Sequence, residues 1–413
     1  MTLRSADSTS PVSRSFALIL AAALIMLVTT GTRQVTGLFV QPIIGTTGVS
    51  IAALSFALAI GQFVWGAAQP VFGALADKFG AFRVLLLGAA MMSAGLALTA
   101  FAKSAWAILF TLGVLSAAGA AAGSFSILIG GTARRLSPAQ RSMAAGSINA
   151  GGSLGQFLFA PLTNAVIGAW GWGAAMFTLA ASSLLTIPLA WPLRKRDSAP
   201  DAKTEESKAA LTLREQLRIA VRDPSYIFLN LGFFTCGFHV AFLVTHLPGE
   251  IRNCGLASNV AANSVALIGL FNVAGSIGAG LLGQRFRMKN VLAGVYGARA
   301  ALIAIYLLMP KTALNMYLFA ASMGLTWLAT VPPTSGIVGK LFGVRYLGTL
   351  FGLTLVSHQT GAFLGAWLGG VAMARLGSYT WIWYADMALA LLAALANLPI
   401  REDKPVPRAA VAA

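Results

Sequence analysis

Long apolar stretches alternate with short polar segments along the whole chain. Most of these stretches reach the roughly 20 residues that an α-helix needs to cross the hydrocarbon core of a bilayer. A soluble α/β protein with buried strands would have shorter apolar runs and longer polar segments between them. The pattern therefore predicts an all-α membrane protein with twelve transmembrane helices, at residues 15–40, 51–76, 84–102, 105–130, 141–167, 172–193, 225–247, 259–284, 289–309, 313–337, 346–373 and 379–399.

Composition supports this prediction. Hydrophobic residues make up 57% of the chain and charged residues 10%, whereas a soluble domain has about 25% charged residues. The apolar segment that starts at Ala17 continues to Val40, which indicates an uncleaved first span and not a signal peptide. The two cysteines predict neither a disulfide framework nor a zinc site. No nucleophile–base constellation, phosphate-cradling loop or metal-ligand cluster is present, so we expect no enzyme, cofactor or metal.

One long polar segment, residues 194–224, separates the sixth span from the seventh. It contains SAPDAKTEESK, whose composition is typical of a flexible linker. TLREQLRIAVRD follows, and it predicts a short amphipathic helix that lies on the membrane surface or in solvent. The predicted organisation is an N-terminal six-helix half at residues 1–193, this linker, and a C-terminal half with a short tail at residues 225–413.

The net charge of +17 comes from basic residues that sort by loop. If the N-terminus is cytoplasmic, 23 Lys and Arg residues fall in cytoplasmic segments and only 4 in outer loops. Positive charge gathers on the cytoplasmic side of membrane proteins. The sorting predicts that both termini are cytoplasmic, and it accounts for the basic charge without a nucleic-acid partner.

Internal similarity indicates a duplicated six-span unit. Aligning the two halves places Arg33 in span one opposite His239 in span seven. Glycines at GxxxG spacing in spans five and eleven predict close helix packing, or surfaces that slide during transport. Three pairs match at nearly one offset, 206 to 210 residues: Pro42 with Pro248, Gly73 with Gly280, and Gly155 with Gly365.

The segment Gly73-x-Leu75-x-Asp77-x-x-Gly80-x-x-Arg83 resembles the signature loop motif of the major facilitator superfamily. It lies between spans two and three, where that family has it, and the resemblance covers nearly the whole chain. The resemblance implies two pseudo-symmetric six-helix halves. It also implies that Gly73, Asp77, Gly80 and Arg83 are gating residues, which latch one access state through ion pairs and helix-end contacts.

A finer resemblance is to bacterial members of the monocarboxylate-transporter-like branch. It rests on TRQVTGLFVQP in span one, GFHVAFLVTHLP in span seven and HQTGAFLGAWLGG in span eleven. Animal members carry an Asp and an Arg in span eight. This chain departs from them there, since Asn272 and Ser276 are the strongly polar residues of its span eight.

Polar side chains within the spans are the candidates for a substrate site, because a charge in the bilayer costs on the order of 3 kcal/mol unless it is paired or hydrated. Arg33 is the expected anion-binding cation, since a guanidinium binds a carboxylate through two hydrogen bonds. The alternative is that Arg33 extends to the membrane interface. The other candidate substrate-binding residues are Gln62, Asn149, Gln156, His239, Asn272, Trp327, His358 and Gln359.

Three further residues are candidates for proton transfer or ion pairing: His246, Arg299 and Asp386. Histidine titrates near neutral pH and can carry a proton. Arg299 and Asp386 lie in spans nine and twelve, which are peripheral in this fold. We expect them to pair with each other or with polar groups of the cavity. If Arg299 faces the cavity instead, it supplies a second anion site.

The predicted function is secondary active transport of a small, monocarboxylate-like organic anion across a bacterial inner membrane, by alternating access and proton symport. One alternative is uptake of a larger polar or aromatic nutrient such as a riboflavin-like vitamin, bound by the amides and Trp327. Efflux of a small toxic compound and a nutrient sensor without transport are others. The expected partners are the small-molecule substrate, the lipid bilayer and protons, and the protein is expected to be a monomer.

Overall fold

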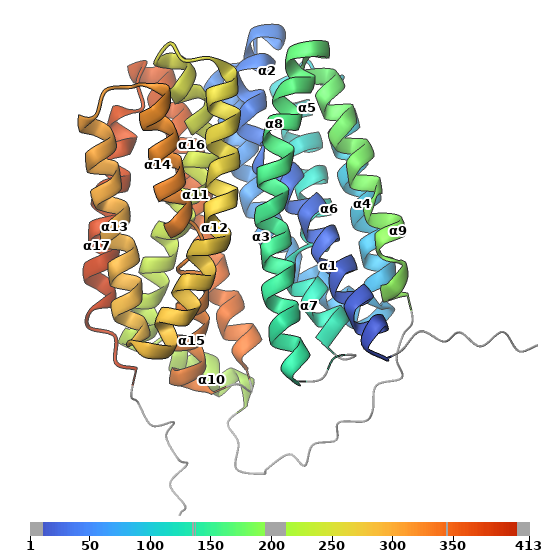
Figure 1. Ribbon diagram of the computed structural model, residues 1–413, viewed down its shortest axis with the longest axis vertical. Coiled ribbons are helices and arrows are strands. Elements are labelled where there is room, and N and C mark those ends of the chain that lie inside the picture. The colour runs from blue at the N-terminus through green and yellow to red at the C-terminus, as the bar shows by residue number, and fades with distance from the viewer. Residues whose placement is uncertain (1–10, 134–135, 137, 195–211, 344–345, 403–413) are drawn as a thin grey trace, which may run out of the picture.

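The computed structural model describes residues 11–133, 136, 138–194, 212–343 and 346–402 (Figure 1). These residues form helices and no strand. The N-terminal helices are α1 (Pro11–Gln34), η1 (Thr36–Phe39), α2 (Val40–Thr47), α3 (Ile51–Phe79), α4 (Ala81–Thr99), α5 (Ala105–Ile108), η2 (Leu109–Ser116), α6 (Ala117–Ala122), α7 (Phe125–Ala133), α8 (Pro138–Leu184), α9 (Thr186–Leu189) and η3 (Trp191–Leu193).

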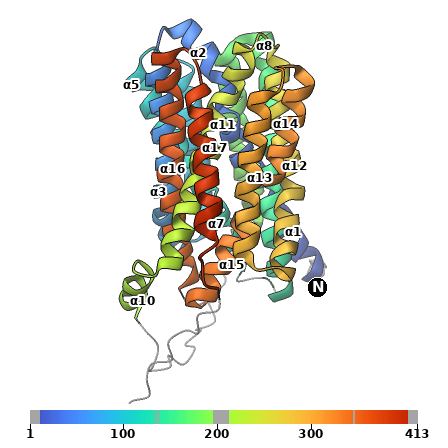
Figure 2. The same ribbon diagram turned by 90° about the vertical axis from the view of Figure 1, so that its left-hand side faces the viewer.

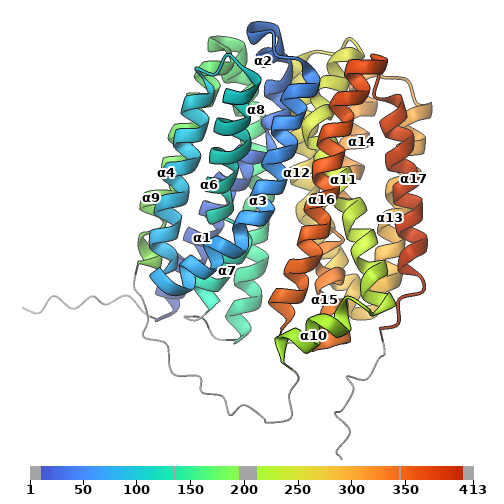
Figure 3. The same cartoon turned by 180° about the vertical axis from the view of Figure 1, so that it is seen from behind.

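The short helix α10 (Leu213–Ala220) precedes the C-terminal helices. Figures 2 and 3 show α10 at one end of the bundle, which we call the linker end, and α2 at the opposite end, which we call the far end. The C-terminal helices are α11 (Pro224–Asn253), α12 (Ser258–Arg285), α13 (Met288–Leu308), α14 (Ala313–Thr326), α15 (Val331–Phe342), α16 (Leu347–Leu376) and α17 (Thr380–Asn397).

The predicted all-α membrane fold is confirmed. Ten segments of the described residues are long and apolar enough to cross a membrane. One of them, Met143–Leu189, holds the predicted fifth and sixth spans, because α8 continues through a bend at Gly171, where φ is +82°. The predicted eleventh span corresponds to α16.

Three predicted spans are not single α-helices. The first is broken after Gln34, passes through η1 and continues in α2 to Thr47. The fourth contains the π-helix η2. The tenth, predicted over 313–337, lies in the apolar segment Ala313–Phe342, but it consists of two helices: α14 ends at Thr326 and α15 begins at Val331. Pro332 and Pro333 lack the N–H groups that would continue the helical hydrogen bonds across the gap.

Glycines set the packing within each group of helices. A Cβ at Gly155 would clash with the Leu27 carbonyl oxygen, and one at Gly361 would clash with that of Phe234. At these glycines the backbone of α8 packs directly on that of α1, and the backbone of α16 packs directly on that of α11. The GxxxG glycines of the predicted fifth and eleventh spans therefore pack within their own halves of the chain.

The two groups of helices meet at the far end and in the middle of the bundle. A Cβ at Gly37 on η1 would clash with the Val244 carbonyl oxygen on α11, and one at Gly370 on α16 would clash with Ser55 on α3. Near the linker end of these packed helices, no heavy atom lies within 4 Å of where a Cβ would be at Gly146, Gly278, Gly348 and Gly352. The tight glycine contacts between the groups thus lie toward the far end and in the middle of the described helices.

The predicted amphipathic helix forms as α10, and it docks on the C-terminal helices. Its N-terminus is closed by a capping box between Thr212 and Glu215. These hydrogen bonds lower the pKa of the Glu215 carboxyl. Gln216 Nε2 donates to the Phe342 carbonyl oxygen at 3.4 Å, and Ala220 is buried.

A buried carboxylate, Glu402, ties the linker end of the C-terminal helices together. It accepts from the Lys289 backbone N–H at 2.6 Å near the start of α13, and from Lys340 Nζ at 2.8 Å on α15. A carboxylate at a helix N-terminus is stabilised by the helix dipole. Glu402 is buried, so solvent screens its bond to the Lys289 N–H little, whereas the exposed Lys340 leaves the ion pair more screened.

We expect Glu402→Gln to lower thermal stability. The substitution removes the charge from two hydrogen bonds, and a bond to a charged group contributes about 1.5–3 kcal/mol. The measurement is the melting temperature of the detergent-purified protein. Glu215→Gln, on exposed α10, is the control and should change it much less; equal shifts for the two variants would contradict this account.

Candidate functional site

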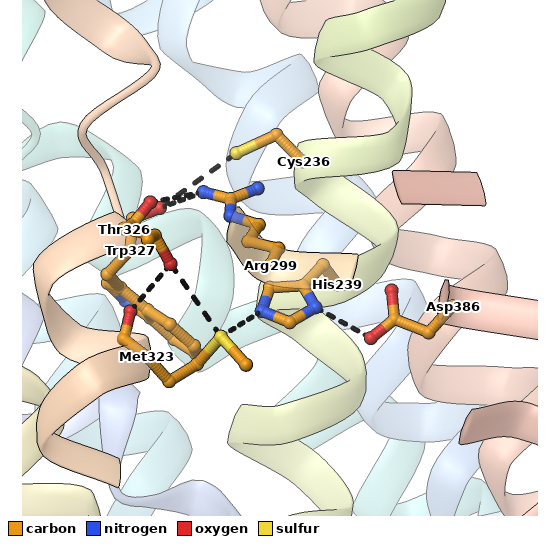
Figure 4. Close-up of polar contacts among 7 residues, drawn as sticks. All are labelled: Cys236, His239, Arg299, Met323, Thr326, Trp327 and Asp386. Carbon is orange, nitrogen blue, oxygen red and sulfur yellow. Dashed lines mark hydrogen bonds and ion pairs between the residues drawn. The ribbon is translucent and has the colours of Figure 1, made fainter. Parts of the chain in front are cut away.

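A buried histidine–carboxylate pair lies inside the C-terminal helices. His239 on α11 and Asp386 on α17 are both 0% exposed, and His239 Nδ1 lies 2.6 Å from Asp386 Oδ2 (Figure 4). On the other side of the ring, Nε2 lies 3.2 Å from the Met323 sulfur on α14. Asp386 Oδ1 has no hydrogen-bond partner among the described residues. The pair thus joins three helices without contact with solvent.

Arg299 on α13 binds the break between α14 and α15. Its Nη2 donates to the carbonyl oxygens of Thr326 at 2.5 Å and Trp327 at 2.7 Å (Figure 4). These carbonyls lie at the C-terminal end of α14, where helix carbonyls lack intrahelical partners and carry partial negative charge. Nε and Nη1 have no partner within the described part of the chain, and Arg299 is 0% exposed.

Arg299 and Asp386 were expected to pair with each other or with cavity polar groups. They do not form an ion pair with each other: Asp386 pairs with the candidate His239, and Arg299 binds backbone carbonyls. Because its guanidinium is fully buried, Arg299 is not a second anion site open to the cavity in this conformation.

Asn272 on α12 holds the same break from its other side. The Leu328 backbone N–H donates to Asn272 Oδ1 at 3.0 Å, and Asn272 Nδ2 donates to Ser153 Oγ on α8 at 2.8 Å. A second amide on α8, Gln156, donates to the Val265 carbonyl oxygen on α12 at 3.1 Å. Both candidate amides therefore form hydrogen bonds between the N-terminal and C-terminal helices.

Arg33 ends α1 where the first span breaks. Its Nη2 donates to Gln62 Oε1 on α3, and the guanidinium lies 4.1 Å from the Trp65 ring centre. Such a contact between a cation and an aromatic face is favourable. Arg33 is half-buried and lines a cavity of about 40 Å³ with Thr32, Thr36, Gln62 and Ser116, among apolar side chains. The structure thus brings two candidates, Arg33 and Gln62, together.

The other candidate substrate ligands are dispersed. Trp327 is fully buried, with its ring centre 6.0 Å from that of His239. His358 packs on Phe233 at 4.8 Å between ring centres. Gln359 is buried against Gly66 between α16 and α3, and its Oε1 lacks a partner in the described residues. Asn149 is half-buried, and its backbone carbonyl lies 3.5 Å from Ser153 Oγ.

His246 lies apart from the His239–Asp386 pair. Its Nε2 donates to the Ala366 carbonyl oxygen at 2.7 Å, and its ring packs on Tyr379 at 5.1 Å between centres. These contacts lie among C-terminal helices and include no carboxylate. The geometry therefore gives His246 a packing role between α11 and α16.

The candidate gating residues lie at the linker end of α3 and α4. Gly73 is within α3, Gly80 joins the two helices with φ +88°, and Arg83 is exposed on α4. The positive φ explains the glycine at position 80. The side chain of Asp77 lies outside the described part of the structure, so its predicted ion pairing stays a prediction.

A second cavity, of about 210 Å³, lies at the far end between the two groups of helices. The repeat-related Pro42 and Pro248 both line it, together with Arg252. Nearby, Tyr306 donates to Glu250 at 3.0 Å, and Lys311 Nζ lies 3.4 Å from the Tyr306 ring centre. Burial lowers the pKa of Lys311, and the Glu250 carboxylate opposes this shift.

Sequence reasoning missed three residues of the sites. Trp65 lies one helical turn from Gln62, so the face shared with Arg33 was a usable signal. Ser153 lies one turn from Gln156 in the same way. Met323 had no signal, since a methionine in an apolar helix is ordinarily core.

Within the described residues, no group of three His, Cys, Asp or Glu side chains could hold a metal ion.

Comparison with known proteins places the chain in a family. A model of the Major Facilitator Superfamily matches residues 21–366. The chain belongs to this superfamily. Its fold and relatives are those of transporters and not of enzymes.

Two relatives of this superfamily member are carboxylate carriers by name. The oxalate:formate antiporter of Oxalobacter formigenes is 28% identical over 405 residues, which cover 95% of this chain and 93% of the relative. Monocarboxylate transporter 13 of Rattus norvegicus is 24% identical over 350 residues, covering 83% and 79%.

Solved structures support the major facilitator fold. A D-xylose–proton symporter matches with a TM-score of 0.74 at 15% identity, over 94% of this chain and 98% of that one. A bacterial homologue of the human lysosomal transporter Spinster, solved in an inward-facing and unoccupied conformation, matches with a TM-score of 0.73 at 16% identity, over 95% and 99%.

Proposed function

We propose that this protein is a secondary transporter that moves a small organic monocarboxylate across a bacterial inner membrane by alternating access, together with a proton. The observation that carries the proposal is the environment of Arg33. Its guanidinium is half-buried at a helix break, and its partners are an amide and an indole ring. Neither partner neutralises its charge, so the site retains one positive charge for a substrate.

The charge count favours a monoanion over a dianion. Arg299, the other arginine within the spans that the sequence predicts, binds backbone carbonyls and is fully buried. A dianion such as oxalate would meet one cation and bring one uncompensated charge into the bilayer. An unpaired charge there costs on the order of 3 kcal/mol. The carboxylate carriers among the relatives support the substrate class, while this charge count separates the proposed substrate from oxalate.

The packing between the two groups of helices supports alternating access. Gly37 and Gly370 pack tightly across the two groups toward the far end, beside the cavity that Pro42 and Pro248 line. We assign the linker end to the cytoplasm, because loops there carry most of the Lys and Arg residues. The bonds from Asn272 to Ser153 and from Gln156 to Val265 also join the two groups, and they are contacts that rocking would rearrange.

The vitamin alternative has less support. It relies on the buried amides and on Trp327, but Asn272 and Gln156 hydrogen-bond between helices and Trp327 is 0% exposed. A flat, neutral substrate would have no free amide or indole face at these positions.

The test is uptake of radiolabelled formate, pyruvate, oxalate and riboflavin by proteoliposomes, with and without an inwardly directed proton gradient. We expect pyruvate or formate to be taken up and oxalate to be rejected. Arg33→Gln should raise KM by about tenfold to a hundredfold, because a hydrogen bond to a charged group contributes about 1.5–3 kcal/mol. Arg375→Gln, an exposed arginine at the end of α16, removes the same charge elsewhere and serves as the control. Riboflavin uptake that Arg33→Gln leaves unchanged would contradict the proposal.

A further inference from the structure

We propose that the His239–Asp386 pair binds the transported proton, and that Arg299 beside it couples proton binding to binding of the substrate anion. This inference rests on the proposed proton-coupled transport. It assigns the proton to a buried pair on α11 and α17 and not to a residue of the Arg33 site.

The contacts of the imidazole indicate that the pair holds a proton in this conformation. Nδ1 faces a carboxyl oxygen at 2.6 Å, and Nε2 faces a thioether sulfur at 3.2 Å. Carboxylates and thioethers accept hydrogen bonds, and a neutral imidazole has only one N–H to donate. Both contacts are satisfied when the pair carries one further proton, either as imidazolium and carboxylate or as imidazole and carboxylic acid.

We call His239, Asp386 and Arg299 the buried cluster. The fixed positive charge of Arg299 determines how the proton changes the net charge of this cluster. Without the proton, the pair carries one negative charge, near the positive charge of Arg299, which binds the carbonyl of the Trp327 whose ring lies beside His239. With the proton, the pair is neutral and the cluster has a net charge of +1. A net charge in a low-dielectric interior is unfavourable, so proton binding favours the arrival of an anion, and the anion favours the proton.

The titratable groups around the pair come from three helices. Cys236 lies on α11, Arg299 and Tyr296 lie on α13, and His358 on α16 lies beside Cys236. The adjoining end of α14 contributes Met323 and backbone carbonyls. No Asp or Glu other than Asp386 enters the cluster among the described residues, so the pair is its sole source of carboxylate charge.

Direct contacts link the pair to the interface between the two groups of helices. The His239 ring meets Met323 and Trp327, which border the break after α14. Asn272 binds that break at Leu328 and reaches Ser153 on α8. Loss of the proton removes the N–H that His239 Nε2 donates to the Met323 sulfur, and this alters the packing at the end of α14. The Asn272–Ser153 bond then transmits the change from the helix break to the N-terminal helices.

The first experiment needs no substrate. Imidazolium quenches indole fluorescence, and the Trp327 ring lies 6.0 Å from that of His239. If the proton resides on the imidazole, the tryptophan fluorescence of the purified wild type should change with pH in a one-proton transition. Asp386→Asn and His239→Gln should abolish this transition, whereas His246→Gln, a buried histidine on the same helix without a carboxylate partner, should retain it. A transition that survives in both pair variants, or that only His246→Gln removes, would overturn the proposal.

The second experiment uses pyruvate in proteoliposomes. For Asp386→Asn we expect at least a tenfold loss of accumulation driven by a proton gradient, while pyruvate–pyruvate exchange, which needs no net proton movement, continues. Gradient-driven accumulation at wild-type level would overturn the proposal. If the wild type moves no carboxylate, the proposed function fails, and the substrate-free titration still decides whether this pair binds the proton. If Asp386→Asn does not fold, His239→Gln decides both experiments.

Discussion

Gly37→Ala is expected to reduce transport at least tenfold while the protein remains folded. The added methyl group would clash with the Val244 carbonyl oxygen at the far end, where η1 packs directly on α11. Overpacking typically costs about 1–3 kcal/mol, and here the obstacle is backbone, which yields less than a side chain. The clash lies between the two groups of helices, so it can be relieved by opening the far end, which shifts the population away from this conformation.

Two matched variants make this expectation specific. Gly155→Ala introduces a similar clash with the Leu27 carbonyl, but within the N-terminal helices, and should lower the melting temperature more than Gly37→Ala does. Gly45→Ala lies on α2, with no atom within 4 Å of the new methyl group, and should affect neither property. Wild-type transport by Gly37→Ala would show that closure at this contact is not part of the cycle.

Arg299→Met is expected to destabilise the protein strongly. The substitution removes the guanidinium donor from both carbonyls at the helix break, which leaves Thr326 without this bond and Trp327 with only the Cys236 thiol at 4.0 Å. A buried group that loses its partner costs about 1–3 kcal/mol, so the loss for two carbonyls is about 2–6 kcal/mol. It also removes the cation that balances the Asp386 carboxylate in the unprotonated cluster.

The melting temperature of the purified protein measures this effect. Arg375→Met, on the exposed end of α16, is the control and should melt like the wild type. The double variant Arg299→Met with Asp386→Asn removes both charges, so we expect it to lose less than the sum of the single changes. Strict additivity would contradict the charge balance between these residues.

Much of the fold could be predicted from the hydrophobic pattern, because each span must satisfy its backbone hydrogen bonds internally and so has to be a helix. The breaks were harder to predict. Pro332 and Pro333 signalled the break of the tenth span, but α14 ends six residues before Pro332, where Arg299 and Asn272 stabilise the free backbone groups. The position of the break depends on side chains from neighbouring helices, so it could not be predicted from the sequence of the tenth span alone.

The candidate site could be predicted as a set of residues but not as an arrangement. The free-energy cost of an ionisable side chain in the bilayer identifies four candidates whatever their partners are: Arg33, His239, Arg299 and Asp386. Which of them pair depends on helix rotation: Asp386 faces His239 and not Arg299. The amides were the most ambiguous, since Asn272 and Gln156 suit a substrate as well as a neighbouring helix.

The order of helices has a consequence for biogenesis. α13 enters the membrane before α14, so Arg299 arrives there before the carbonyls that it binds. His239 on α11 gains its carboxylate partner later still, because Asp386 is on α17, the last helix of the described residues. Inserting an isolated Arg or Asp at mid-membrane costs roughly 2.5–3.5 kcal/mol each. We therefore expect the C-terminal helices to become fully stable only when α17 enters the bilayer, because a chain truncated before Thr380 lacks the carboxylate partner of His239.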